Sequence, residues 1–353
     1  MTTVVKYIIP QCIRDPLGAR LWIICEGMQL DLSGNRPCYG AAMEYNMNTI
    51  LSLRGGGVRG CLTACALVKL ESQLGGLVRD HITMVAGTST GALLAAGIAA
   101  GIPATDLLAV YTDRAAEIFQ PSGLIGDVDF IAKGHKCDIA NLNRVLVEVF
   151  GSQAGLLIND CPIRVMLVAT AMNGHNWFFV RDNPRNAQTT GKVKLLDAAT
   201  ASAAAPTVFQ PWQITEGLPT PAYFADGGTG GQANPVYQAC VEAFEFDDLF
   251  PSYGGCLSAG TRVIELGTGF FPDTSAVPPK GLLSTVEWVI SDLLDASEDA
   301  ADAATRLAWP GILQVFNIQL PSNISESDVS AIPQLVTLGN QMAAGMDWTK
   351  ILA

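Results

Sequence analysis

Short apolar runs alternate with helix-like patterns along the chain from residue 48. Thr49–Leu53 is apolar enough for a buried strand, and three consecutive glycines follow it closely. Beyond these glycines, Leu62, Ala66 and Leu70 have the spacing of one helix face. The segment therefore predicts a strand, a glycine loop and a helix.

The same succession occurs a second time. Ile82–Ala86 predicts a strand that leads into the pentapeptide 87–91, and Ala92–Ala100 predicts a helix that ends at Gly101. Two such units in sequence are typical of a parallel sheet with helices on its faces. We therefore expect an α/β fold with three layers, α/β/α, around a mainly parallel central sheet.

Further elements follow in the second half of the chain. Apolar runs predict four more strands, at Ile163–Thr170, Trp177–Val180, Tyr223–Ala225 and Val263–Leu266. Helical patterns occupy much of 104–160, around a polar loop near Gly123–Asp138, and return at Leu195–Ala205 and Leu282–Arg306.

Two parts of the chain differ in how clearly their sequence predicts a fold. Residues 1–46 hold short β-like pieces broken by Pro and Gly, and we interpret them as an N-terminal extension. At 353 residues the chain exceeds the usual domain size of about 100–150 residues. Residues 47–353 nevertheless fit one large α/β domain that includes the C-terminal helices.

Composition and charge narrow the classes of function. Hydrophobic residues make up 49% of the chain and charged residues 15%, so a large core is expected. The formal net charge of −12 repels phosphate backbones, which argues against nucleic-acid binding. The same charge disfavours electrostatic adsorption to anionic lipid, whereas apolar insertion at a membrane surface stays compatible.

Membrane and compartment signals are weak. The longest apolar stretch, Gly91–Ile102, is shorter than the roughly 20 residues of a membrane-spanning helix, and the N-terminus lacks a secretory pattern. Nine scattered cysteines without a C-x-x-C pair indicate reduced thiols and argue against zinc. We expect a cytoplasmic protein, compatible with a peripheral place at membranes.

The pentapeptide Gly87-Thr88-Ser89-Thr90-Gly91 has the form of a nucleophile elbow. In such an elbow a serine occupies a sharp turn between strand and helix, and flanking glycines leave room for the backbone. The following helix offers free N–H groups where negative charge develops. Because a predicted strand precedes it and a predicted helix follows, Ser89 is the candidate nucleophile.

A serine nucleophile needs a base, and the only histidines are His81, His135 and His175. In an α/β-hydrolase the catalytic histidine comes last in the chain, but no histidine follows position 175. His135 and His175 lie in polar, loop-like segments, so a Ser-His-Asp triad is disfavoured. Asp226, at the end of a predicted strand and before two glycines, is the candidate base.

Aspartate is a weak base with an ordinary pKa of about 3.9, so such a site depends on stabilising an oxyanion. A single oxyanion donor contributes about 2.7–4 kcal/mol. Gly55, Gly56 and Gly57 are the candidate donors, because successive glycines let their N–H groups converge. Arg59 either fixes this loop or faces a substrate anion, and an ordinary surface arginine is equally compatible.

Together these motifs resemble the patatin-like phospholipase family, which combines D-G-G-G-x-R-G, G-x-S-x-G and a later D-G-G. Here they stand as R-G-G-G-V-R-G (54–60), G-T-S-T-G (87–91) and D-G-G (226–228). Shorter echoes are A-S-A-A-A-P-T (201–207) and L-G-T-G (266–269). One departure is Arg54, which stands where the family usually carries Asp.

The resemblance implies a patatin-like fold with a Ser89–Asp226 dyad and an oxyanion hole formed by the Gly55–Gly57 amides. It implies a phospholipase A-type hydrolase that cleaves fatty acyl esters of membrane lipids through an acyl-enzyme, without metal or organic cofactor. A homo-oligomer is left open. Supporting positions in this interpretation are Arg59, Thr90, Gly87, Gly91, Gly227 and Gly228.

Three alternatives stay beside this interpretation. An acyltransferase would use the same acyl-enzyme, and a lipid-binding regulator would keep the fold without turnover. Gly55, Gly57 and Gly60 also fit the G-x-G-x-x-G fingerprint of dinucleotide binding. The acid that this fingerprint requires is matched only by Asp80, which precedes the strand leading to Ser89.

Overall fold

The computed structural model describes residues 47–121, 134–183, 189–246, 260–271, 297–321 and 324–353. The predicted extension 1–46 lies outside these ranges, as do residues 122–133 of the expected polar loop and residues 282–296 of the expected amphipathic helix. Within the described ranges, no helix combines the length and apolar character that crossing a bilayer requires.

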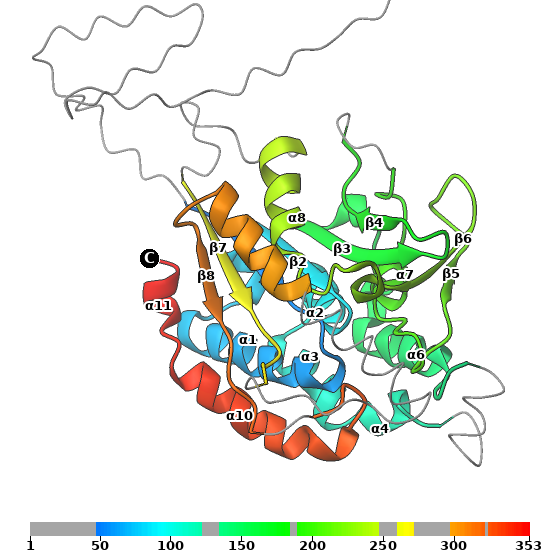
Figure 1. Cartoon of the computed structure of the whole chain (residues 1–353), viewed down its shortest axis with the longest axis horizontal. Coiled ribbons are helices and arrows are strands. Elements are labelled where there is room, and N and C mark those ends of the chain that lie inside the picture. The colour runs from blue at the N-terminus through cyan, green and yellow to red at the C-terminus, as the bar shows by residue number, and fades with distance from the viewer. Residues whose placement is uncertain (1–46, 122–133, 184–188, 247–259, 272–296, 322–323) are drawn as a thin grey trace, which may run out of the picture. The chain divides into compact units, whose positions relative to one another are not determined.

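An eight-stranded sheet forms the centre of the fold (Figure 1). Its order is β5-β6-β3-β2-β1-β7-β8, with β4 also paired to β3. The strands are β1 (Asn48–Leu53), β2 (Met84–Thr88), β3 (Arg164–Ala171), β4 (Asn176–Phe179), β5 (Trp212–Ile214), β6 (Ala222–Asp226), β7 (Thr261–Leu266) and β8 (Leu313–Phe316). The pairs among β3, β2, β1, β7 and β8 are parallel, whereas β4 and β6 run antiparallel to β3. The sheet is therefore mainly parallel, as predicted.

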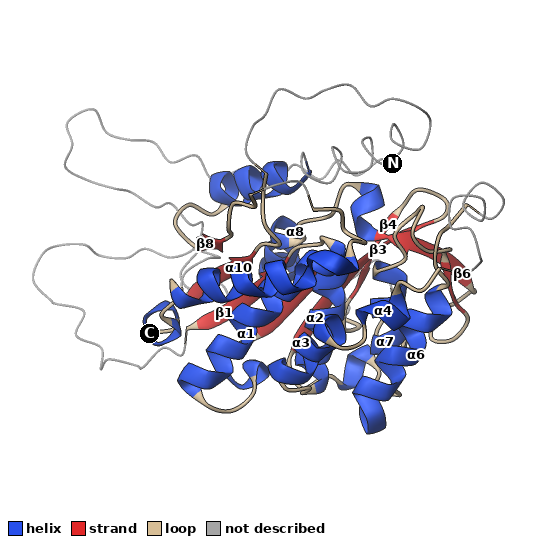
Figure 2. Cartoon of the chain, turned by 90° about the horizontal axis from the view of Figure 1, so that it is seen from below, coloured by secondary structure: helices blue, strands red, loops and turns tan. Residues whose placement is uncertain are grey.

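Helices cover both faces of this sheet (Figure 2). Successive strand residues point to opposite faces, so Leu51 and Val85 belong to one apolar cluster while Ile50 and Met84 belong to another. The larger cluster holds buried residues of α1 (Gly60–Leu74), α2 (Thr90–Ala100), α3 (Ala104–Thr112), α4 (Ala115–Ile118), α6 (Ile139–Phe150), α7 (Leu195–Ser202) and α10 (Ile332–Ala344). The smaller cluster holds those of α8 (Val236–Val241), with Ala301 packed against it. The expected α/β/α layering is confirmed.

Several boundaries differ from the sequence patterns. The second strand runs Met84–Thr88 instead of Ile82–Ala86, because Ile82 caps a short 3-10 helix at Val78–His81. Strand β2 therefore ends directly before Ser89. Strands β5 and β8 were not predicted, since they are only three and four residues long and too mixed in polarity to show a period.

Candidate active site

Ser89 occupies the turn between β2 and α2, with φ 56° and ψ −126°. A positive φ is unfavourable for a residue with a side chain, so the surroundings must hold this turn in place. The Ser89 amide donates to Oγ of Ser202 at 2.9 Å, and the Ser202 hydroxyl in turn donates to the carbonyl of Val168. Two hydrogen bonds through Ser202 of α7 therefore link the elbow to β3 and hold it in place.

The two glycines of the elbow allow backbone segments to approach closely. A Cβ on Gly87 would lie 2.2 Å from the carbonyl oxygen of Gly91, and one on Gly91 would lie 2.2 Å from that of Leu53. Both positions thus exclude any side chain. This packing brings the first turn of α2 against the end of β1, where the glycine loop begins.

Asp226 lies at the end of β6 and is buried, with 5% of its surface exposed. Its Oδ1 accepts a hydrogen bond from the Gly228 amide at 2.8 Å. Burial raises the pKa of Asp226 to about 7; a hydrogen bond from the Ser89 side chain and the Gly228 amide lower it, while the charge of Glu326 raises it. Ser89 and Asp226 are therefore neighbours, delivered by strands that both flank β3.

The glycine loop lies beside Ser89, since a Cβ on Gly55 would be 3.3 Å from Cβ of Ser89. Within the described residues, the amides of Gly56 and Gly57 donate to no protein acceptor. The amide of Gly55, by contrast, donates to the carbonyl of Ala233 at 2.9 Å. Of the three expected oxyanion donors, Gly56 and Gly57 are thus the two that stay available.

Arg59 is buried and bonds to the backbone of the glycine loop. Its Nε donates to the carbonyl of Gly56 at 3.3 Å, and Nη2 pairs with Oε1 of Glu326 at 2.7 Å. Its guanidinium carbon also lies 5.3 Å from the centre of the Phe271 ring, in cation–π range. Of the roles considered for Arg59, fixing the loop is the one that these contacts describe.

Arg54, the departure from the family pattern, is buried among three carboxylates. Its Nε pairs with Glu265, Nη1 with Glu298 at 2.9 Å and Nη2 with Asp302 at 2.9 Å. Asp302 also accepts from Nδ2 of Asn234 at 2.8 Å. The position that usually carries an acid therefore carries a base here, and acids of β7 and of the helical residues 297–308 surround it.

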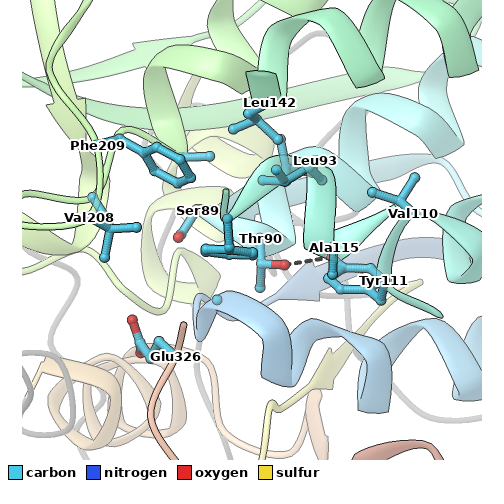
Figure 3. A pocket seen from close by; sticks show the side chains of 15 residues that line it. Ser89, Thr90, Leu93, Val110, Tyr111, Ala115, Leu142, Val208, Phe209 and Glu326 are labelled. Carbon is cyan, nitrogen blue, oxygen red and sulfur yellow. Dashed lines mark hydrogen bonds between the residues drawn. The ribbon is translucent and has the colours of Figure 1, made fainter. Parts of the chain in front are cut away.

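An apolar pocket opens beside Ser89 (Figure 3). In this view Ser89 lies between Val208 and Phe209 on one side and Leu93 on the other, with Glu326 below. The cavity measures about 560 Å³ including its open mouth. It is lined by Gly57, Ser89, Thr90, Leu93, Val110, Tyr111, Ala115, Ile118, Phe119, Leu142, Ala203, Ala205, Val208, Phe209 and Glu326.

Polar groups in the pocket wall are few and are paired. The hydroxyls of Thr90 and Tyr111 share a hydrogen bond, so each satisfies the other. Burial raises the pKa of Tyr111, so this phenol stays neutral. The pocket thus offers an apolar ligand almost no competing polar contact.

The three histidines bond to groups other than those of Ser89 and Asp226, although His135 bridges Thr207 near the pocket wall. His175 is exposed beyond the end of β3, and His81 contacts the carbonyl of Gly75 at 2.6 Å. His135 contacts the carbonyl of Cys137 at 3.0 Å. None of the three lines the pocket.

Comparison with known proteins identifies the family. The sequence model described as "Patatin-like phospholipase" matches residues 51–239, more than half of the chain. The chain belongs to the patatin-like phospholipase family. The matched range includes the glycine loop, the elbow and the D-G-G motif.

Individual relatives of this patatin-like chain include bacterial and plant proteins. A cGAMP-activated phospholipase of Pseudomonas aeruginosa is 36% identical over 193 residues, which is 53% of this chain and 54% of the relative. Patatin-17 of Solanum cardiophyllum is 27% identical over 278 residues, 71% of this chain and 69% of that protein. VipD from Legionella pneumophila, a solved structure, has a TM-score of 0.40 and 12% identity, and the match covers 87% of this chain and 67% of that one.

The match leaves much of the bacterial relatives uncovered. The chain spans 54%, 58% and 64% of the three cGAMP-activated phospholipases.

Within the described residues, no group of His, Cys, Asp and Glu side chains is arranged to hold a metal ion.

Three residues that contact the site were not singled out from the sequence. Ser202 and Thr268 lie in the short echoes 201–207 and 266–269, whose spacing carried no chemical argument. Glu326 is one acid in a polar stretch far from the motifs, so no local signal distinguishes it. Only the packing of distant segments brings these side chains to the elbow and the glycine loop.

Proposed function

We propose that this patatin-like chain hydrolyses fatty acyl esters of phospholipids or related lipids, with Ser89 as nucleophile and Asp226 as base. The observation that carries the proposal is the meeting of Ser89 and the buried Asp226 at the ends of the two strands that flank β3, beside an apolar pocket. A carboxyl with its pKa near neutrality is suited to accept and return a proton. An ordinary aspartate would be too weak a base for this task.

Acylation follows from the positions of these groups. Ser89 Oγ attacks the ester carbonyl carbon while its proton passes to Asp226, giving a tetrahedral oxyanion. The carbon–oxygen bond to the leaving alcohol then breaks, and Asp226 returns the proton to that alcohol. The product is an acyl ester on Ser89.

Deacylation repeats these steps with water. A water molecule gives its proton to Asp226 and attacks the acyl carbon. The bond to Ser89 breaks, the serine recovers its proton, and a fatty acid leaves. This cycle draws on no metal and no organic cofactor.

The amides of Gly56 and Gly57 are the proposed oxyanion donors. Each faces no protein acceptor within the described residues, whereas the Gly55 amide is already bonded to Ala233. Removing one such donor in other hydrolases lowers kcat about 10²–10³-fold. Two preorganised donors would therefore stabilise the tetrahedral oxyanion directly.

The apolar pocket supports a fatty acyl chain as the group transferred. Its lining offers aliphatic and aromatic side chains beside the Ser89 hydroxyl, and the polar Thr90 and Tyr111 groups satisfy each other. Phospholipases from Pseudomonas aeruginosa and Vibrio cholerae are among the relatives, which favours lipid esters over soluble ones. Membrane lipids are thus the proposed partners, reached from a peripheral, cytoplasmic position.

The proposed catalytic unit is residues 47–353, with 1–46 as an extension. Helix α10 packs against α1, and Glu326 from the same C-terminal part contacts the glycine loop. Truncation after residue 270 is therefore expected to abolish activity. A homo-oligomer stays an open part of this proposal.

The test combines active-site labelling with product analysis. We expect Ser89→Ala to abolish labelling by a fluorophosphonate probe and the release of fatty acid from a mixed lipid extract, read by mass spectrometry. Asp226→Asn is expected to lower ester hydrolysis about 10²–10⁴-fold, the usual contribution of a general base. Because three bacterial relatives are cGAMP-activated phospholipases, each assay is run with and without cGAMP.

His175→Ala and His135→Ala serve as matched controls, and both are expected to keep wild-type activity. Loss of activity in either one, as complete as in Ser89→Ala, would refute the dyad. Acyl transfer to an added alcohol in place of free fatty acid would point to the acyltransferase. Lipid binding without any Ser89-dependent turnover would point to a regulator.

A further inference from the structure

Thr268 lies on the loop after β7 and is almost fully buried against the glycine loop, with 1% of its surface exposed. Its hydroxyl donates a hydrogen bond to the carbonyl oxygen of Gly55. The contact is close, because a Cβ on Gly56 would lie 2.4 Å from Oγ1 of Thr268. Thr268 takes no part in the proposed acylation or deacylation.

The next carbonyl of the loop is held in a comparable way. The carbonyl oxygen of Gly56 accepts from the Arg59 amide at 3.1 Å and from Arg59 Nε at 3.3 Å. Arg59 is itself held by Glu326, whose carboxylate pairs with Nη2. The backbone carbonyl of Glu326 also accepts from the Val58 amide at 2.7 Å.

These bonds decide where the free amides point. A trans peptide unit is planar, so its C=O and N–H point in opposite directions. A donor on the Gly55 carbonyl therefore turns the Gly56 N–H away from Thr268, and the donors on the Gly56 carbonyl turn the Gly57 N–H away from Arg59. We propose that Thr268 and Glu326 are positioning residues that orient the Gly56 and Gly57 amides as an oxyanion hole.

This inference rests on the proposed function, because it assigns a role only if the two amides bind an oxyanion. The backbone on both sides of Thr268 is held by hydrogen bonds. Asn317 Oδ1 accepts from the Gly269 amide at 2.8 Å, and Thr63 donates to the Gly267 carbonyl at 3.1 Å. Thr268 is thus fixed from both sides along its own chain.

The first variant removes the Thr268 hydroxyl and keeps its shape. With a p-nitrophenyl ester of a fatty acid, Thr268→Val is expected to lower kcat about 10- to 100-fold, part of the effect of losing one oxyanion donor. KM is expected to stay unchanged, because the ground-state ester does not yet carry the negative charge. Thr268→Ser restores the donor and is expected to recover most of kcat.

The second variant acts on the other carbonyl without removing a buried group. Glu326→Gln keeps the backbone bond to Val58 and removes the ion pair with Arg59. The fall in kcat is expected to be smaller than for Thr268→Val, because the Arg59 amide still holds the Gly56 carbonyl. All rates are measured at pH 9, where Asp226 is ionised in every variant.

Thr190→Val is the matched control. Thr190 is also fully buried, and its hydroxyl donates to the carbonyl of Val180 at 2.9 Å, away from the pocket. We expect a Tm loss similar to that of Thr268→Val with an unchanged kcat. A common loss of kcat in both variants would mean general destabilisation and would overturn the inference.

The remaining outcomes separate this inference from the proposed function. If the wild type shows no Ser89-dependent turnover, both the proposed function and this inference are refuted. Ser89-dependent turnover with wild-type kcat in Thr268→Val overturns the positioning role alone, as does equal loss in Thr268→Ser. If Thr268→Val does not fold, Thr268→Ser and Glu326→Gln decide: wild-type kcat in Glu326→Gln, or a Thr268→Ser protein that folds but loses activity, contradicts the inference.

Discussion

Asp226 and Glu326 are two carboxylates near enough for the charge of one to act on the other. Burial first, and then the negative charge of Glu326, raise the pKa of Asp226 to about 7. Glu326 reaches this position from the C-terminal part of the chain while its own charge is paired with Arg59. Burial thus contributes most to the basicity of the proposed base, and a residue far away in the sequence raises it further.

A pH profile tests this relationship. A carboxyl base works only when ionised, so kcat/KM of the free enzyme is expected to rise tenfold per pH unit below about 7 and to level off above it. Glu326→Gln removes a negative neighbour, and the acid limb is expected to move to lower pH. An acid limb near pH 4 in the wild type would contradict the assignment of Asp226 as the base.

The same raised pKa predicts that removing the charge of Asp226 increases the free energy of unfolding. The native state holds the Asp226 proton more tightly than the unfolded chain, so this residue favours folding at low pH and that contribution is lost as pH rises through about 7. One unit of pKa corresponds to about 1.4 kcal/mol. Asp226→Asn is therefore expected to raise the free energy of unfolding at pH 8 by roughly 1–3 kcal/mol.

Denaturation at two pH values checks this expectation. At pH 4 the wild-type carboxyl is protonated, so the advantage of Asp226→Asn is expected to disappear. Asp113→Asn, a change at an exposed aspartate at the end of α3, is expected to leave stability unchanged at both values. A destabilised Asp226→Asn protein at pH 8 would show that the charge is accommodated better than its burial suggests.

The buried cluster around Arg54 predicts a large loss of stability. Arg54→Met leaves Glu265, which is fully buried, without its cationic partner. Removing one partner of a buried pair typically costs about 3–5 kcal/mol. We expect a loss of this size in chemical denaturation, and a larger one for Arg54→Asp, the residue usual in the family.

Arg114 provides the comparison for Arg54. It also pairs with two carboxylates, Glu117 and Glu148, but at the surface, where such pairs contribute little. Arg114→Met is expected to cause no large loss. If the double variant Arg54→Met with Glu265→Leu recovers stability, the unpaired Glu265 carboxylate, and not the lost packing of Arg54, causes the loss of stability in Arg54→Met.

The pocket wall predicts a change in chain-length preference. Ala115 of α4 is buried and lines the pocket beside Tyr111, whereas Ala116 on the same helix is exposed. Ala115→Phe fills part of the cavity and is expected to lower kcat/KM for long-chain esters about tenfold or more relative to short-chain esters. Ala116→Phe is expected to leave the ratio unchanged, and an equal effect of both variants would place the acyl chain elsewhere.

Much of this fold follows from local patterns. A strand, a glycine loop and a helix are encoded within about 20 neighbouring residues, so the elbow at Ser89 and the loop at Gly55–Gly57 could be predicted. Short strands such as β5 and β8 could not, because three or four residues carry too little periodicity. Their place in the sheet comes from pairing with strands far away in the chain.

The sequence by itself determined which backbone turns form, where the nucleophile and the candidate carboxylate stand, and that no histidine follows them. Tertiary structure alone decided that the Gly55 amide is used by Ala233, that Arg54 meets three acids, and that Glu326 and Thr268 reach the glycine loop. The reason is physical: glycine and apolar spacing act on the neighbouring backbone, whereas these contacts arise only when non-consecutive strands lie side by side in the sheet.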